Sequence, residues 1–236
     1  MHKKNNMQTK HKKIILLTGS VAIFAILIGI VSDIILYGHP ISGAQFINSG
    51  LPNLLNVGPQ RLFVGGMLGM VFIALGLSGF WQLYLAIKPA GGFLPLIFWF
   101  LEIYVVTMGA SMHLSYTFYG EVSRAMLSVD PEISKYFIQL FMRAENYMNI
   151  FTVTLFVTSG IASIIFIFVV LTKVTNYPKW IVFVAPGIPV VAVMLIGKIL
   201  PAPFGGYVSA SYAYLGFLVT AIISTVVLYR REKLIV

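Results

Sequence analysis

The chain of 236 residues contains no cysteine, and only 10% of its residues are charged. Without cysteine there can be no disulfide, thiolate nucleophile, palmitoyl anchor or cysteine-based metal site. A soluble domain of this size would carry roughly 25% charged residues. Because the chain is instead 58% apolar, with a mean hydropathy of +0.91, an ordinary soluble domain is excluded.

Several catalytic motifs are also missing. Only His39 and His113 of the four histidines lie outside the N-terminal tail, and there is no His-Glu-x-x-His. A multi-histidine metal hydrolase is therefore not expected. The sequence has no Walker-A motif and no Gly-x-Gly-x-x-Gly after a strand. A nucleotide-driven transporter or motor domain within this chain is therefore excluded. We expect no metal site and no cofactor.

What the chain has is long apolar stretches. Six of them are each close to the ~20 residues that a helix needs to cross a bilayer, whereas the period-2 pattern of an outer-membrane barrel is absent. The prediction is an all-α fold, a polytopic membrane helix bundle. It has one domain, residues 14–229, between basic tails at 1–13 and 230–236. Its six transmembrane helices are expected at about 14–37, 61–87, 93–118, 147–171, 180–200 and 207–229.

Local signals add detail between these stretches. Asp130-Pro131-Glu132 is a good helix start, because Asp caps well and proline suits the first position. Apolar residues then recur at helical spacing, which predicts an outer amphipathic helix over 131–146. With no breaker before Gly160, this helix can run straight into the stretch 147–171. A short interfacial helix is expected around Leu51–Val57.

Two stretches contain helix-modifying residues. In the second, Gly65, Gly69 and Gly76 form a stripe of small residues that lets a neighbouring helix approach closely. In the fifth, Pro186-Gly187-Ile188-Pro189 predicts a kink or a local opening of the helix.

The basic residues predict the orientation. The two ends of the chain and the turns at 88–92 and 173–179 hold eleven of the sixteen Lys and Arg residues. An excess of Lys and Arg marks the cytoplasmic side, so both termini are expected in the cytoplasm. The net charge of +9 then reflects contacts with anionic headgroups rather than with nucleic acid.

Polar residues within the apolar stretches are the candidate site, because an ionisable group at membrane depth normally faces other helices or a water-filled cavity. Glu102 lies near the middle of the third stretch. His113 follows eleven residues later, on the same helix face and about 16 Å along the axis. The candidates for ligand binding or proton coupling are Glu102, Asp33, His113, Arg61, Arg143, Glu145 and Asn149.

Each candidate also has a structural interpretation. Glu102 can be a protonated or hydrogen-bonded acid that joins two helices. His113 can be a hydrogen-bonded structural residue, and Asp33 can be solvated or paired at the interface. Arg61 and Arg143 can be partner charges for the acids. A polar stripe on the fourth stretch could line a cavity that descends toward Glu102; its members are Glu145, Asn149, Thr152, Ser159 and Ser163.

Three short segments resemble a known group. Ser32-Asp33-Ile34-Ile35-Leu36-Tyr37 closes the first stretch, Arg61 opens a glycine-rich second stretch, and Leu200-Pro201-Ala202-Pro203 precedes a tyrosine-rich last stretch. Together they resemble an uncharacterised family of small six-span bacterial integral membrane proteins. In that family the first-span acid usually follows glycine, whereas Ser32 stands there in this chain. The resemblance implies a bacterial cytoplasmic membrane and no known activity.

The leading hypothesis is a non-enzymatic protein that binds or transports a small or lipid-like ligand through an outward-facing polar pocket between the first, third and fourth spans. One alternative is an intramembrane enzyme acting on a lipid or isoprenoid, with Glu102 or Asp33 as general acid and His113 as proton partner. A second is an accessory or bacteriocin-immunity-type protein, working as a homo-oligomer or with a partner membrane subunit. The expected partners are the lipid bilayer and a small ligand.

Overall fold

A computed structural model describes residues 2–54 and 57–231. Those residues form helices and connecting loops and contain no strand, so the all-α prediction is confirmed. Residues 232–236 of the predicted C-terminal tail lie outside the described residues, and so do residues 55 and 56 of the predicted interfacial helix.

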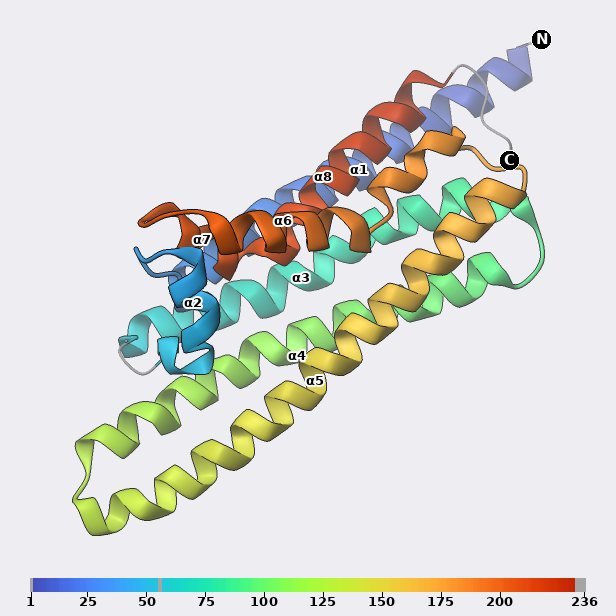
Figure 1. Ribbon diagram of the computed structural model, residues 1–236. Helices are drawn as coiled ribbons and strands as arrows, with labels where there is room; N and C mark the ends of the chain where they lie inside the picture. Colours follow the sequence, from blue (N-terminus) through green and yellow to red (C-terminus); the bar gives the residue numbers. More distant parts are fainter. Residues whose placement is uncertain (1, 55–56, 232–236) are drawn as a thin grey trace.

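Five long helices form the bundle (Figure 1). α1 packs against α3 and α8, α3 packs against α4, and α4 packs against α5. Within the described part of the chain, these five are long and apolar enough to cross a membrane. They are α1 (His2–Tyr37), α3 (Pro59–Ile87), α4 (Leu94–Ser128), α5 (Pro131–Thr172) and α8 (Tyr212–Arg230).

The predicted span at 180–200 is not one continuous helix. It consists of a 3₁₀ helix, η3 (Lys179–Val184), followed by α6 (Gly187–Ile199), which has 13 residues. A helix of that length covers about 20 Å, less than the ~30 Å hydrocarbon core. The predicted opening at Pro186 is confirmed. There the Gly187 N–H, which the break frees, donates to the Ser163 Oγ of α5 at 2.9 Å.

The last predicted span also begins later than expected. A separate helix, α7 (Phe204–Ala210), ends at Ser211, and the long helix α8 starts at Tyr212. The interfacial helix expected near Leu51 is instead a pair of short elements, α2 (Gly43–Ser49) and η1 (Leu51–Leu54). Ser42 caps α2 through a reciprocal hydrogen-bonded capping box with Gln45, which explains the earlier start.

The connections divide between the two ends of the bundle (Figure 1). The start of α1, the end of α8, the turn at η2 (Lys88–Ala90) and the turn at 173–178 lie at one end, here called the terminal end. The elements α2, η1 and α7 and the α4–α5 connection lie at the other, here called the loop end. The chain therefore passes along the bundle six times, with η3 and α6 together making the fifth passage.

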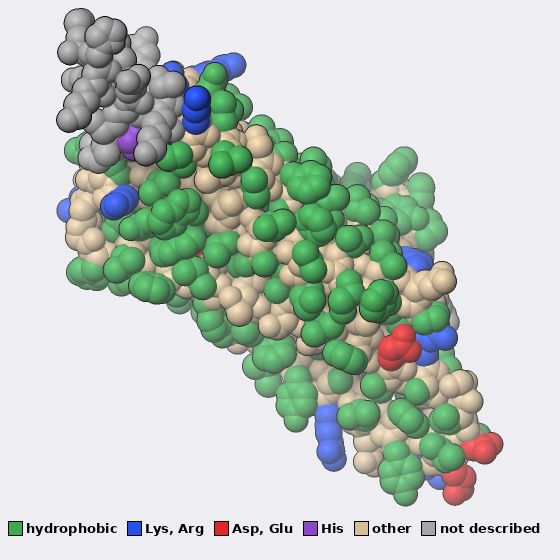
Figure 2. Space-filling view, turned by 180° about the vertical axis from the view of Figure 1, so that it is seen from behind, with side chains coloured by type: hydrophobic (Ala, Val, Ile, Leu, Met, Phe, Trp, Pro, Cys, Tyr) green, Lys and Arg blue, Asp and Glu red, His purple; other side chains and the backbone are tan. Residues whose placement is uncertain are grey.

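The α4–α5 hairpin extends past the other helices at the loop end (Figure 1). α5 has 42 residues, which corresponds to about 63 Å. The predicted amphipathic helix at 131–146 and the predicted span at 147–171 are thus one helix, as the lack of a breaker allows. Charged side chains gather toward the ends of the molecule, whereas hydrophobic ones cover its middle (Figure 2).

Glycines of α3 allow close packing against α1 and α4. Gly65 lies against the backbone of Leu36 in α1, and Gly69 lies against the His113 ring in α4. A Cβ at either position would overlap these neighbours, which bears out the packing prediction for both glycines. Gly76 differs, because an added Cβ there would meet nothing within 4 Å.

Candidate functional site

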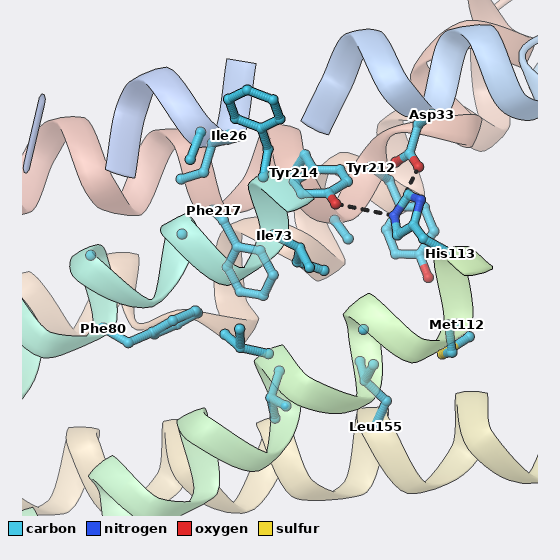
Figure 3. A pocket seen from close by; sticks show the side chains of 18 of the residues that line it. Ile26, Asp33, Ile73, Phe80, Met112, His113, Leu155, Tyr212, Tyr214 and Phe217 are labelled. Atoms are coloured by element: carbon cyan, nitrogen blue, oxygen red, sulfur yellow. Dashed lines mark hydrogen bonds and ion pairs between the residues drawn. The ribbon is translucent and has the colours of Figure 1, made fainter. Parts of the chain in front are cut away.

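A cavity of about 170 Å³ lies among α1, α3, α4, α5 and α8 (Figure 3). Most of its wall is apolar, with Ile26, Phe72, Ile73, Phe80, Leu155 and Phe217 among the lining residues. The polar lining residues, apart from Thr220, sit toward the loop end. They are Asp33, Tyr37, His113, Tyr116, Thr152, Tyr212 and Tyr214.

Four of these side chains are in direct contact, and we call Asp33, Tyr37, His113 and Tyr214 the polar cluster. His113 Nε2 lies 3.4 Å from Asp33 Oδ1 and 3.1 Å from the Tyr214 hydroxyl (Figure 3). The Tyr37 hydroxyl donates to the same Asp33 oxygen at 3.2 Å. The cluster joins α1, α4 and α8. Both contacts to Asp33 are made with Oδ1, so the other carboxyl oxygen, Oδ2, contacts no other member of the cluster.

Helix geometry explains how the cluster forms. Tyr37 is one turn after Asp33 on α1, so the two side chains share a face. The Ser32 hydroxyl donates to the Gly65 carbonyl at 2.6 Å, which ties this part of α1 to α3. Tyr214 is near the start of α8, at the same end of the bundle as Asp33.

The packing of His113 favours a neutral imidazole. Its ring contacts the cluster through Nε2 alone, and among the described residues Nδ1 has no hydrogen-bond partner. Nδ1 lies against Gly69 of α3. An imidazolium carries an N–H on both nitrogens, and a buried N–H without an acceptor is costly. The contact with Asp33 is therefore best described as a hydrogen bond.

Arg61 is committed to the backbone of α1. Its Nε donates to the Ile35 carbonyl at 2.8 Å, and its Nη2 donates to the carbonyls of Gly38 at 2.9 Å and Ile34 at 3.3 Å. The last carbonyls of a helix lack partners within the helix, so Arg61 satisfies the C-terminal end of α1. It is not the counter-charge of Asp33.

Glu102 is placed apart from the cluster. It is fully buried in α4, and neither carboxyl oxygen has a hydrogen-bond partner among the described residues. Val105 and Val106, one turn later, line the cavity, but Glu102 itself does not. The structure thus brings Asp33 and His113 together and leaves Glu102 in the apolar interior.

The remaining candidates lie on α5, away from the cavity wall. Arg143 and Asn149 are exposed, and Glu145 is half-buried. Thr152 of the same predicted stripe does line the cavity, whereas Ser159 and Ser163 are buried farther along the helix.

The tyrosines of this site, Tyr37, Tyr116 and Tyr214, are not among the residues selected from the sequence. Two signals were available. Tyr37 follows Asp33 by four residues and Tyr116 follows His113 by three, which are the spacings that place side chains on one helix face. Nothing in the sequence indicates that α8 brings Tyr214 to His113, because that contact depends on how the helices assemble.

Across residues 2–54 and 57–231, no group of three or more His, Asp or Glu side chains could hold a metal ion.

The described residues form an all-α bundle with five long apolar helices that could cross a membrane and a polar cluster inside it, an architecture consistent with a multi-pass membrane protein. The chain belongs to the family of unknown function DUF6796, whose family model matches residues 1–231. The resemblance to an uncharacterised family is thereby confirmed. No curated protein and no solved structure matches the chain.

Proposed function

We propose that the protein binds a small or lipid-like ligand inside the membrane, in the cavity among α1, α3, α4, α5 and α8. The supporting observation is an apolar cavity that ends in the polar cluster of Asp33, Tyr37, His113 and Tyr214. Ligand sites typically combine an apolar wall with a few convergent polar groups. The apolar part would hold a tail, and the polar cluster would orient a head.

The size of the cavity limits the ligand. Its volume of about 170 Å³ is close to that of an engineered apolar cavity of roughly 150 Å³ that takes up benzene. The ligand would therefore be a molecule of about one ring or one short chain, or the end of a longer lipid tail. An entire phospholipid would not fit.

The proposed topology has six crossings, with both termini in the cytoplasm of a bacterium. Five helices meet the length and apolarity of a span, and η3 with α6 would make the remaining crossing. Two observations support an even number: the described ends of α1 and α8 lie at the same end of the bundle (Figure 1), and that end carries most of the basic residues. The polar cluster would then lie near the outer surface.

The enzyme alternative fits the geometry less well. A catalytic histidine needs one nitrogen for an orienting group and the other for the substrate. Here Asp33 and Tyr214 both contact Nε2, while Nδ1 lies against Gly69. No nitrogen of His113 is directed at the cavity without a partner, and Glu102 does not line the cavity. Ligand binding is the function that this arrangement supports best.

Filling the cavity tests the proposal. Gly76 lines the cavity, and a Cβ there meets nothing within 4 Å, so Gly76→Leu should fold and occupy the ligand space. Gly160 is equally open but lies on α5 outside the cavity lining, so Gly160→Leu is the matched control. The readout is mass spectrometry of small molecules extracted from each purified protein.

The expected result is a species that copurifies with the wild-type protein and with Gly160→Leu but is lost from Gly76→Leu. Identical extracts from all three proteins would contradict binding in this cavity. Such extracts, together with a stoichiometric copurifying protein, would favour the accessory-protein alternative.

A further inference from the structure

We propose that the ligand is an amphiphilic amine, with a cationic ammonium head at Asp33 and a short apolar tail in the cavity. This inference rests on the proposed binding function and names the chemical class that the same site would select. It follows from the charges, the aromatic rings and the size of the site.

The described part of the protein supplies no counter-charge for Asp33 at the polar end of the cavity. Asp33 is the acidic residue of the cavity lining, and no Lys or Arg is among the described residues that line it. Arg61, a predicted counter-charge, instead donates to the carbonyls of Ile34, Ile35 and Gly38. A buried carboxylate without a counter-charge is unfavourable, and a ligand ammonium would supply the missing positive charge.

The contacts of His113 and Tyr37 supply no positive charge to Asp33. Both act on Asp33 Oδ1, and the packing of His113 favours the neutral ring, as argued above. These groups therefore stabilise the carboxylate through hydrogen bonds. Oδ2 remains for an N–H donor of the ligand, and hydrogen bonds between charged groups are the strong ones.

Aromatic rings surround the carboxylate on three helices. Tyr37 and Tyr116 pack with ring centroids 5.5 Å apart, and the Tyr214 ring lies 5.8 Å from that of His113. Tyr212 lines the same end of the cavity. Aromatic faces attract cations within about 6 Å of the ring centroid. A carboxylate among tyrosine rings is therefore a favourable environment for an ammonium and an unfavourable one for an anion.

The apolar wall of the cavity determines the chemistry of the ligand's tail. It includes Ile26, Ile73, Phe80 and Phe217, which extend from the polar cluster toward the terminal end (Figure 3). In a volume of about 170 Å³ these side chains can cover a short hydrocarbon tail. A hexyl chain is a suitable probe.

Three probes with the same tail separate the head-group classes: hexylammonium, hexan-1-ol and hexanoate. Binding to the full chain in lipid nanodiscs is measured by calorimetric titration. Wild type should bind hexylammonium at least about tenfold more tightly than hexan-1-ol, since a hydrogen bond to a charged group outweighs a neutral one by about that factor. Hexanoate should bind most weakly. Asp33→Asn should lower hexylammonium affinity to that of hexan-1-ol.

The controls separate this inference from the function on which it rests. Gly76→Leu should abolish binding of hexylammonium and hexan-1-ol and so measures their partition into the lipid alone, while Gly160→Leu should bind all three probes as wild type does and so controls for the substitution itself. Equal affinities of wild type for hexylammonium and hexan-1-ol, still abolished by Gly76→Leu, would overturn the amine assignment and leave the cavity as the binding site. Titrations that are identical in Gly76→Leu and wild type would overturn both. If Asp33→Asn does not fold, the selectivity of the wild-type protein decides alone.

Discussion

His113 is fixed from opposite sides by different means. Asp33 and Tyr214 hold Nε2 through hydrogen bonds, and the backbone of Gly69 lies against Nδ1. The absence of a side chain at residue 69 is therefore what allows α3 to approach α4 at this level and lets the imidazole reach Asp33. One methyl group added at Gly69 should disturb the polar cluster without touching its charges.

Gly69→Ala should destabilise the protein by about 1–3 kcal/mol, the usual range for overpacking a filled interior. Gly76→Ala on the same helix is the control. Its Cβ meets nothing within 4 Å, so the better helix propensity of alanine should leave stability unchanged or slightly raised. Thermal unfolding in detergent measures both variants. Equal melting temperatures for Gly69→Ala and Gly76→Ala would contradict the packing described here.

Glu102 presents the opposite situation, a buried polar group that the described residues leave without a hydrogen bond. A buried carboxyl of this kind costs about 1–3 kcal/mol, and replacing it with an apolar side chain of similar volume often stabilises a protein. Glu102→Met should therefore raise the unfolding temperature. Glu121→Met is the control, because the Glu121 side chain is 49% exposed and its loss should change little.

The variant Glu102→Gln separates structure from function at this residue. It keeps the shape and removes the acid. If it leaves ligand binding unchanged, Glu102 is no part of the site, as its position outside the cavity lining indicates. Lower stability in both Glu102→Met and Glu102→Gln would instead show that the carboxyl has a stabilising partner.

At the scale of elements, a side chain of α5 contacts the break between η3 and α6. Ser163 Oγ accepts the Gly187 N–H at 2.9 Å, at the point where Pro186 interrupts the helical hydrogen bonds. Ser163→Ala should leave this N–H without its partner and destabilise the protein by about 1–2 kcal/mol. Ser78→Ala is the control, because Ser78 is partly exposed and donates to the Leu75 carbonyl of its own helix. An unchanged unfolding temperature for Ser163→Ala would show that Gly187 finds another acceptor.

The elements differ in how well local sequence predicts them. Long apolar stretches predict α1, α3, α4 and α5 because burial in lipid and helix formation follow from composition alone. The proline at 186 predicts the opening in the fifth stretch. The same pattern does not predict that the last span starts at Tyr212, since the bend at Ser211 arises from packing of α7 against α2 and α6.

The site is less predictable than the helices for a physical reason. Asp33 and His113 are recognisable as polar residues at the same membrane level, but their contact depends on the rotation of α1 and α4, which the glycines of α3 set by close packing. Arg61 and Glu102 show the limit of residue type as evidence. Arg61 donates its hydrogen bonds to backbone carbonyls, and Glu102 lies in the apolar interior. Neither position can be predicted from the spacing of nearby residues.

The six passages of the chain constrain the whole molecule. The loop end and the terminal end (Figure 1) would face opposite sides of the membrane. The polar cluster lies toward the loop end, because Asp33 is near the end of α1 and Tyr214 is near the start of α8. The fifth passage has the shortest main helix of the six, α6, which has 13 residues. If η3 and α6 do not cross, the connection at Pro201–Pro203 lies on the cytoplasmic side, and α8 would leave the C-terminus outside.

The lack of native cysteine allows this question to be answered with single-cysteine variants and a membrane-impermeant maleimide. Lys88→Cys at the terminal end, Asp130→Cys at the α4–α5 connection and Ala202→Cys at the loop end all replace exposed residues. In intact cells, the variants at 130 and 202 should be labelled, and the variant at 88 should react only after permeabilisation. If the Ala202→Cys variant is labelled only after permeabilisation, as expected for Lys88→Cys, η3 and α6 do not cross the membrane. Labelling at 88 but not at 130 would reverse the orientation and place the polar cluster near the cytoplasmic surface, where a ligand would enter from inside the cell.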